Sequence, residues 1–307
     1  MRLDALSAGT GAARGRFNGT VHSVFDNACN IAIDDGRLLA LLAPRLANVP
    51  HGVRIDLPPG VAFTGRLVAG QRVGCRTDRL RFAGTELTID LASAKPWRSD
   101  LGTPGIDLAR PEVAVAWRVA WRAWRQFRGA GQQPTPVVPL RRAVERRALV
   151  LAAATRRLRC DKAALAIDRL VGCGPGLTPS GDDLIVGFLA GLWRSGGADP
   201  ERRRFVTSLG VAVSAAARAT SDVSRAYLIH AARGGFSEPI AILTRQLGDG
   251  TNPEQVERAM SAALRVGHQS GSDGVLGLLL GLRAWAPDGW PSAAVDRRSR
   301  PRGGSHG

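Results

Sequence analysis

Hydrophobic and polar positions follow different periods in two parts of the chain. Between about residues 15 and 94, short segments that alternate with period two are separated by glycine- and proline-rich turns, which predicts β-strands joined by hairpins. From Pro111 onward, the apolar positions recur with the spacing of an α-helix. The pattern predicts an α+β protein with a small β-rich, barrel-like N-terminal domain (residues 1–106), a larger mainly α-helical domain (107–285) and a flexible tail (286–307).

Individual elements follow from the same pattern. The predicted strands cover residues 19–23, 30–33, 53–57, 71–77 and 86–91. After a first helix that begins near Pro111, the predicted helices cover residues 140–159, 161–171, 201–219, 225–232, 238–247 and 253–265. The first helix carries Val113, Trp117, Trp121 and Trp124 at helical spacing, with arginines between them. An amphipathic helix that faces the core explains this stripe better than a surface that stacks nucleic-acid bases.

One loop stands out because the sequence that ends it is repeated 90 residues later. The loop reads Gly172-Cys-Gly-Pro-Gly-Leu-Thr-Pro-Ser-Gly-Asp-Asp183, and its last four residues correspond to Ser270-Gly-Ser-Asp273. Each copy is followed by an apolar segment with two glycines four residues apart, which are Gly187 and Gly191, and Gly277 and Gly281. Such spacing leaves one side of a helix without bulky side chains, so we expect two buried helices that pack together through these sides.

Both copies also fit the start of a helix. Ser-x-x-Asp before an apolar run is typical of a capping box, in which the serine accepts a backbone N–H and the acid reaches back. If the two helices run in similar directions, their N-termini converge and offer N–H groups and positive dipole ends to an anion. Capping and core packing alone would explain the serines and acids of both copies. They leave unexplained the irregular loop with Gly174 and Gly176, and the additional acid Asp182.

Composition narrows the functional classes. The formal net charge is +16, and all but two of the 42 basic residues are arginines, which favours acidic partners or anionic substrates. Nucleic acid is not the expected partner, because the sequence lacks zinc-finger, basic-zipper and RNA-recognition signatures. A Gly-x-Ser-x-Gly elbow, a P-loop lysine and a Rossmann fingerprint are also missing, which argues against serine hydrolases, kinases and dehydrogenases.

Cysteine spacing and hydropathy bear on the compartment. The four cysteines are far apart and form no Cys-x-x-Cys pair, so neither a disulfide scaffold nor a structural zinc site is expected. The N-terminus has no apolar signal-peptide core, and no uncharged apolar run of ~18 residues occurs. We therefore expect a cytoplasmic protein without membrane spans.

The loop and its repeat resemble a bacterial family. Gly-x-Gly-Pro-Gly-Leu-Thr-Pro-Ser-Gly-Asp-Asp, followed by Gly267-His-Gln-Ser-Gly-Ser-Asp273, is similar to the family named for the third subunit of oxamate carbamoyltransferase. Val21-His-Ser-Val-Phe25 with Asn30, and the segment from Ser224 to Gly234, fall in the order expected of that family. The resemblance implies a subunit of a hetero-oligomeric enzyme that phosphorolyses oxalurate to oxamate and carbamoyl phosphate in anaerobic allantoin breakdown, a part of purine catabolism. It assigns no catalytic role to a single residue.

Our hypothesis places a small polar acyl-amide substrate and phosphate at the paired helix starts. Backbone N–H groups of residues 176–183 receive anionic oxygen, and Thr178 and Ser180 add hydroxyl groups. Asp182 and Asp183 bind substrate amide groups or Mg²⁺, the one cofactor considered, and His268 moves a proton. The remaining predicted substrate-binding residues are Gly174, Gly176, Gly181, Ser270, Asp273, Arg225 as a carboxylate contact, and His22 in an interdomain cleft.

Two alternatives remain open at the level of the sequence. The first is a magnesium-dependent hydrolase in which Asp182, Asp183 and Asp273 are metal carboxylates. The second is a non-catalytic assembly subunit that senses a metabolite, with the chemistry carried by partner chains.

Overall fold

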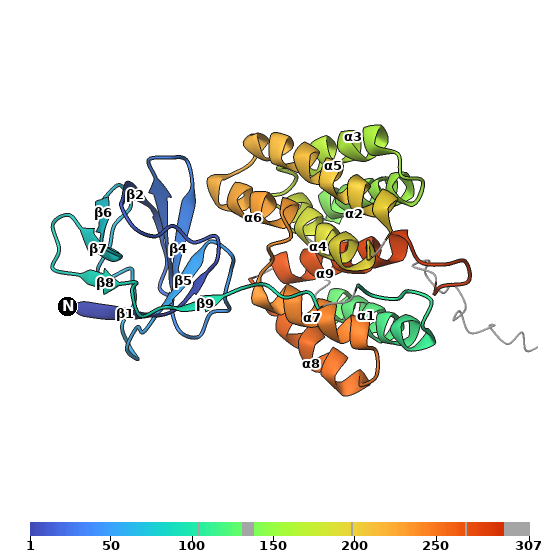
Figure 1. Cartoon of the computed structure of the whole chain (residues 1–307), viewed down its shortest axis with the longest axis horizontal. Helices are drawn as coiled ribbons and strands as arrows, with labels where there is room; N and C mark the ends of the chain where they lie inside the picture. Colours follow the sequence, from blue (N-terminus) through green and yellow to red (C-terminus); the bar gives the residue numbers. More distant parts are fainter. Residues whose placement is uncertain (103–104, 131–137, 198, 268, 292–307) are drawn as a thin grey trace, which may run out of the picture.

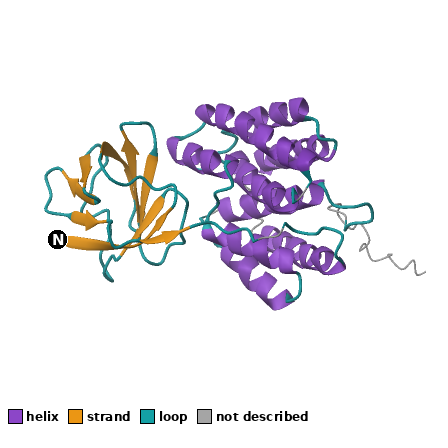
Figure 2. Cartoon of the chain, in the orientation of Figure 1, coloured by secondary structure: helices purple, strands orange, loops and turns teal. Residues whose placement is uncertain are grey.

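The chain folds into a β-barrel domain and a helical domain, which lie side by side (Figures 1 and 2). The structure is a computed structural model, and it describes residues 1–102, 105–130, 138–197, 199–267 and 269–291. The α+β architecture with a barrel-like first domain is confirmed. None of the helices within these ranges is both long and apolar enough to cross a membrane.

Eight strands of the first domain close into a barrel. The described part of the domain contains nine strands, of which the first eight form the barrel: β1 (Arg2–Gly9), β2 (Phe17–Val24), β3 (Ala28–Ile33), β4 (Leu38–Leu42), β5 (Gly52–Ile55), β6 (Arg72–Arg76), β7 (Arg79–Phe82), β8 (Thr88–Asp90) and β9 (Lys95–Trp97). They pair in the order β5-β4-β3-β2-β6-β7-β8-β1-β9, and an additional pairing between β5 and β1 completes the ring. The short strand β9 pairs with the second half of β1 and leads toward the helical domain.

Alternating side chains fill the barrel interior, as the period of two predicts. On β3, for example, Cys29 and Ile31 are fully buried in the barrel core. Strand β4 is an exception, because all five of its residues are buried. Leu39 and Leu41 belong to the barrel core, whereas Ala40 and Leu42 pack outside it against Tyr227 of the helical domain. Burial on both faces explains why the apolar run of β4 lacks the alternation by which the other strands were predicted.

The structure adds four further strands to the predicted set, which are β1, β4, β7 and β9. Strands β4, β7 and β9 each pair with β1 or with a strand that is adjacent to β1 in the ring. β1 does alternate, with a buried Leu3 and Ala5, but it precedes the segment in which strands were expected. β9 has only three residues and contains Pro96, so its sequence carries little strand signal.

The helical domain contains nine α-helices within the described residues. They are α1 (Pro111–Ala130), α2 (Val138–Arg156), α3 (Cys160–Leu170), α4 (Ser180–Ser195), α5 (Pro200–Ala216), α6 (Asp222–Ala232), α7 (Glu238–Asp249), α8 (Pro253–Leu264) and α9 (Ser270–Ala284), with a short 3-10 turn, η1 (Ala217–Ala219), after α5. The tryptophan face of α1 is confirmed as core. Trp117 and Trp124 are buried, and their indole N–H groups donate to the carbonyl oxygens of Leu279 and Ser272 in α9, both at 2.9 Å.

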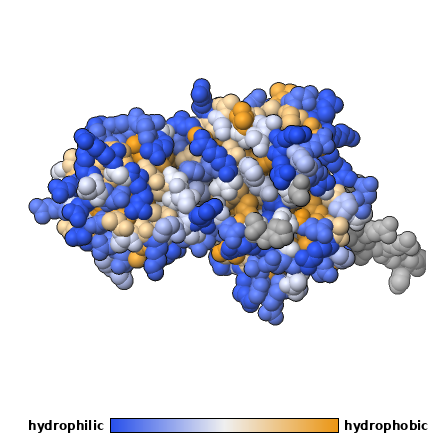
Figure 3. Space-filling model, in the orientation of Figure 1, coloured by the Kyte–Doolittle hydropathy of each residue, from blue (hydrophilic) through white to orange (hydrophobic). Residues whose placement is uncertain are grey.

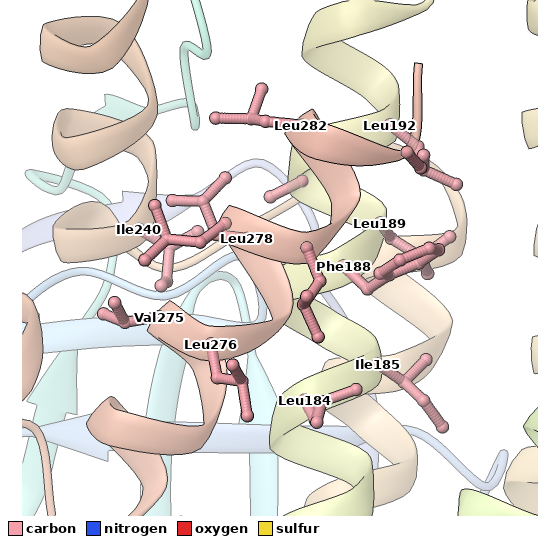
Figure 4. Packing of buried hydrophobic residues seen from close by; sticks show 14 of the residues in the cluster. Leu184, Ile185, Phe188, Leu189, Leu192, Ile240, Val275, Leu276, Leu278 and Leu282 are labelled. Atoms are coloured by element: carbon pink, nitrogen blue, oxygen red, sulfur yellow. The ribbon is translucent and has the colours of Figure 1, made fainter. Parts of the chain in front are cut away.

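Helices α4 and α9 form the centre of this domain and run side by side in the same direction (Figure 4). A Cβ atom on Gly187 would lie 1.8 Å from the Gly274 carbonyl oxygen, and one on Gly277 would lie 2.0 Å from the Leu184 carbonyl oxygen. Such distances are far below van der Waals contact, so both positions require glycine. The predicted packing through the glycine faces is confirmed, and the shared direction brings the two N-termini together.

The contacts between α4 and α9 repeat under the 90-residue offset. The contact of Gly187 with residue 274 has its counterpart in that of Gly277 with residue 184, since each position is 90 residues from its equivalent. Gly181 and Gly271 are equivalent in the same way. A Cβ on Gly181 would meet the Leu170 carbonyl at the end of α3, and one on Gly271 would meet the Ala263 carbonyl at the end of α8. The hairpins α3–α4 and α8–α9 are therefore structural repeats.

Polar side chains cover most of the molecular surface visible in Figure 3, and apolar atoms show there in smaller patches. The first residues of the segment predicted as a flexible tail lie against the helical domain. Ala286 is buried, and the Trp290 indole N–H donates to the Leu108 carbonyl at 2.8 Å. The rest of that segment, residues 292–307, lies outside the described residues.

Candidate functional site

The glycine loop before α4 depends on a backbone that only glycine adopts readily. Gly172, Gly174 and Gly176 have φ angles of 70°, 132° and 90°, in the left-handed region. At Gly174 there is also no room for a side chain, because a Cβ would lie 2.6 Å from the backbone nitrogen of Ser180. The loop stays partly exposed, and Thr178 is half-buried at its end. These glycines shape the approach to the helix start and carry no side chain that could contact a ligand.

Asp182 is a buried structural carboxylate. Its Oδ1 atom accepts the backbone N–H of Gly172 at 2.8 Å. Its Oδ2 atom accepts the hydroxyl groups of Thr220, at 2.5 Å, and Ser224, at 2.7 Å. The side chain is fully buried. It thus ties the glycine loop, the segment after η1 and helix α6 to the start of α4, and these three donors satisfy it without a ligand.

The capping boxes predicted at both repeats do not form. Pro179 and Gln269 occupy the N-cap positions of α4 and α9, and neither helix has a side-chain cap. The serines are the first helical residues and face the opposite helix instead. Ser180 hydrogen-bonds the carboxyl group of Asp273, and Ser270 that of Asp183. The repeat therefore builds a reciprocal cross-link between two helices, which a local capping motif cannot reveal.

Asp183 is connected to the surface loop through two hydroxyl groups. The Ser270 hydroxyl lies next to the Asp183 carboxyl and 2.9 Å from the Thr178 hydroxyl. Burial raises the pKa of Asp183 well above its ordinary value, and the nearby Asp273 and Asp182 charges raise it further, although the Ser270 hydrogen bond opposes this. The Oδ2 atom of Asp183 is buried and has no hydrogen-bond partner among the described residues. Asp183 is thus a buried acid that favours its protonated form.

Asp273 differs from Asp183 because an arginine lies beside it. Arg128, near the end of α1, donates to Asp273 Oδ1 at 3.2 Å and to Glu145 of α2 at 2.8 Å. Burial still raises the pKa of Asp273, but the charges of Arg128 and Arg141 and the Ser180 hydrogen bond work against the shift. The two equivalent acids therefore sit in electrostatically unequal surroundings.

The first backbone amides of α4 are already occupied. The N–H of Gly181 donates to the Cys173 carbonyl, and those of Asp182 and Asp183 donate to the Pro179 carbonyl. The expected reception of anionic oxygen by the amides of residues 176–183 is therefore wrong for 181–183. What the helix starts still offer are the half-buried hydroxyls of Thr178, Ser180 and Ser270, together with the positive dipole ends of two helices.

The arrangement gives little support to a metal at this place. Among the described residues, no three side chains of the kinds that bind metals come together. Both oxygens of Asp182 accept hydrogen bonds from the protein, so this carboxylate points away from Asp183 and toward α6. A shared Mg²⁺ at Asp182 and Asp183 would require those hydrogen bonds to break.

Two predicted site residues lie elsewhere, at the boundary between the domains. The His22 Nε2 atom on β2 is 3.6 Å from Asp222 Oδ2 on α6, and Arg225 pairs with the other oxygen of Asp222. His22 also contacts Ser23, whose hydroxyl accepts the side-chain amide of Asn30. His268, the predicted proton carrier, lies outside the described residues.

The structure brings together five of the predicted site residues at the helix starts, which are Thr178, Ser180, Asp183, Ser270 and Asp273. Gly174, Gly176 and Gly181 shape the backbone around them.

Arg128 and Tyr227 were missed by the sequence analysis. Arg128 comes from α1, 145 residues before the acid that it contacts, and looks like any other arginine of the basic helix face. Tyr227, the one tyrosine of the chain, has its pKa raised to about 12 by burial and by the charge of Asp183. Its uniqueness in the sequence and its position in the segment from Ser224 to Gly234 were the available signals.

Comparison with known families covers both domains. A family model described as oxamate carbamoyltransferase subunit AllH matches residues 170–282, from the end of α3 through most of α9. A model described as the AllH family N-terminal domain matches residues 4–96, which contain most of the barrel. Together the two matches cover about two thirds of the 307 residues. No solved structure matches the chain.

Proposed function

The chain belongs to the family of the oxamate carbamoyltransferase subunit AllH, and on this premise we propose that it contributes a substrate site to a carbamoyltransferase with several kinds of subunit. The substrates we propose are oxalurate and phosphate in one direction, and oxamate and carbamoyl phosphate in the other. The site is the convergence of the α4 and α9 N-termini. The observation that carries this assignment is the hydroxyl chain from Thr178 through Ser270 to the buried acid Asp183.

The reaction needs a proton at a defined moment. A phosphate oxygen attacks the carbamoyl carbon of oxalurate, the bond from that carbon to the oxamate nitrogen breaks, and the leaving nitrogen takes up a proton. The products are carbamoyl phosphate and oxamate, and no electrons are transferred to or from an external group. A buried acid whose pKa is raised favours its protonated form and can supply this proton. Burial raises the pKa of Asp183 well above its ordinary value.

Thr178 and Ser270 would contact the substrate, and Asp183 would act through them. Their hydroxyls can donate to one atom while accepting from another, so a proton can pass from the acid to a bound amide nitrogen. The positive ends of α4 and α9 favour the anionic groups of the substrates. Asp273 and Ser180 form the equivalent pair on the other side, where Arg128 adds a positive charge.

The test uses the enzyme assembled from co-expressed subunits and measures carbamoyl phosphate formed from oxalurate and phosphate. Asp183→Asn keeps the shape of the side chain but removes the proton, so we expect the rate to fall by about 10²-fold. Asp161→Asn, an exposed acid in the first turn of α3, is the matched control and should leave the rate unchanged.

The pH profile provides a second readout. A group that must be protonated to act gives a rate that falls as the pH rises through its pKa, and Asp183→Asn should remove this descending limb. If the variant keeps the full rate and the same profile, Asp183 does not supply the proton. The chain would then be better described as a non-catalytic assembly subunit, with the chemistry on its partners.

A further inference from the structure

A cavity of about 420 Å³ opens between the two domains, away from the paired helix starts. One wall comes from the barrel, where Gly11 follows β1 and the hairpin between β3 and β4 contributes Ile33, Arg37 and Leu38. The other wall is helix α6 and the residue that ends it, Arg233. This cavity has no role in the reaction proposed at the helix starts. Its lining includes His230 and Arg225, the residue predicted to contact a carboxylate.

Helix α6 separates this cavity from the interior of the helical domain. Asp222, Arg225, Ile229 and Arg233 follow one another at intervals of three and four residues, so they share the face that lines the cavity. Ser224 lies on the other side, where it holds Asp182. The polar residues of the cavity face are thus not explained by packing inside the helical domain.

The charge of the cavity walls is positive. Arg37, Arg225 and Arg233 line the cavity, and Asp222 is its acidic residue. Arg37 pairs with Asp35 in its own turn, and Arg225 pairs with Asp222. Arg233 is exposed and makes no ion pair with any residue that the structure describes. A ligand with anionic groups would therefore meet the guanidinium of Arg233 and, beside it on the same helix face, the guanidinium of Arg225 that Asp222 pairs with.

His230 adds a polar group that can either donate or accept. Burial lowers the pKa of His230, and the charge of Arg233 lowers it further, so the neutral form of the ring is favoured. The ring stacks on His51 with centroids 5.4 Å apart. The barrel approaches so closely that a Cβ on Gly11 would lie 2.2 Å from the ring. His230 is thus fixed in the wall between the two domains.

We propose that this interdomain cavity binds a small organic dianion. Its acidic groups, carboxylate or phosphate, would be held by Arg233 and Arg225, its carbon portion would lie against Ile33, Leu38 and Ile229, and His230 would hydrogen-bond one of its oxygens. The ligand would contact both domains at once and so hold them in one arrangement. This assignment is independent of the chemistry proposed at the helix starts.

The first experiment measures binding to the full-length chain by calorimetry. The probes are succinate as an organic dicarboxylate, glycerol 3-phosphate as an organic phosphate dianion, and succinamide as an uncharged analogue of succinate. We expect at least one charged probe to bind and succinamide to bind at least tenfold more weakly. Lack of binding by both charged probes, or equal binding of succinamide, would overturn the proposal.

Variants then locate the bound probe. Arg233→Ala removes an exposed side chain and should leave the fold intact, which circular dichroism verifies, yet it should weaken binding at least tenfold, and Arg233→Lys should restore part of it. Arg122→Ala, which removes an exposed arginine of α1, and Thr178→Ala at the helix starts should both leave the affinity unchanged. If Arg233→Ala has no effect, or Thr178→Ala weakens binding as much, the probe occupies a different site and the cavity assignment is wrong.

Discussion

Two adjacent acids at the start of α4 have different tasks because their partners come from different parts of the chain. Asp182 accepts hydrogen bonds from Gly172 and from two hydroxyls beyond α5, whereas Asp183 faces the second repeat. A helix turns by about 100° per residue, so neighbouring side chains necessarily point in different directions. One motif of two acids therefore provides a structural clamp and a buried proton-carrying group.

The clamp should be costly to remove. Asp182→Ala would leave the Gly172 amide and the Thr220 and Ser224 hydroxyls without their buried acceptor, so we expect the free energy of unfolding to fall by on the order of 3 kcal/mol. Chemical denaturation followed by circular dichroism measures this. Asp199→Ala provides a comparison, because Asp199 caps α5 in an exposed position through two backbone N–H groups, and its loss should be clearly smaller. A variant as stable as the wild type would contradict the clamp.

At the scale of single residues, the sequence predicts which residues form the site. It predicts less well how their side chains are oriented. The repeat predicted that the serines and acids of both copies would converge, and they do. Their hydrogen bonds were predicted as local caps, but the serines reach across to the other helix. The two hydroxyl partners of Asp182 lie 38 and 42 residues further along the chain, and Arg128 lies 145 residues from Asp273. Such pairings depend on the tertiary fold, and a single sequence contains no local signal for them.

The central element is the helix pair α4 and α9. Because glycines lie where the two helices meet, their backbones contact each other directly without side chains between them. Large apolar side chains of both helices point outward from the contact, and Leu184, Phe188, Val275 and Leu278 are among those seen in Figure 4. These residues are almost completely buried. The pair is thus surrounded by the core of the helical domain, and its spacing controls where the two helix starts meet.

Substitutions at two glycines can test the close contact. Gly187→Ala places a methyl group 1.8 Å from the Gly274 carbonyl oxygen, a backbone atom that cannot move aside, so the helices must separate. We expect a loss of about 3 kcal/mol or more in unfolding free energy. Gly274→Ala is the matched control in the partner helix, because its methyl group would meet ordinary contacts at 3.6 and 3.7 Å. The better helix propensity of alanine should make that variant neutral or more stable by up to ~1 kcal/mol.

Thermal and denaturant unfolding measures the stability of both variants and so tests the close contact between the helices. Equal effects of the two substitutions would mean that the helices are free to shift apart.

The glycine spacing allowed the contact between α4 and α9 to be predicted from the sequence, because the spacing has a fixed period on a helix. Strand β4 could not be predicted in that way, because it is buried on both faces and its apolar run has no period.

At the scale of the whole molecule, the two domains share polar as well as apolar contacts. The Glu238 carboxylate at the start of α7 accepts both the backbone N–H and the side-chain amide of Asn48, at 2.9 and 3.0 Å. The backbone N–H of Glu238 donates in return to the Asn48 carbonyl at 2.9 Å. Tyr227 packs on the outer face of β4 nearby. These contacts fix the barrel against the middle of α6 and the start of α7.

Glu238→Ala should loosen this boundary without unfolding either domain. The backbone amide of Asn48 would lose its acceptor, so we expect its hydrogen exchange to accelerate at least about tenfold, while amides inside the barrel keep their rates. Hydrogen exchange followed by mass spectrometry or nuclear magnetic resonance measures this. Glu254→Ala, which removes an exposed acid from α8, should leave the exchange at Asn48 unchanged. Unchanged exchange in Glu238→Ala would show that the apolar contacts alone hold the domains.

The reciprocal contacts of α4 and α9 have the geometry of an isologous dimer interface, in which each contact occurs twice across a two-fold axis. In a true homodimer, the two halves would have to remain identical, and any acid placed at one helix start would appear unchanged at the other. Joining the halves in one polypeptide removes that constraint. Arg128 can therefore accompany Asp273, while the neighbours of Asp183 among the described residues are hydroxyl and acidic groups. Within this part of the chain, a symmetric scaffold presents one acid beside a cation and another beside hydroxyl and acidic groups.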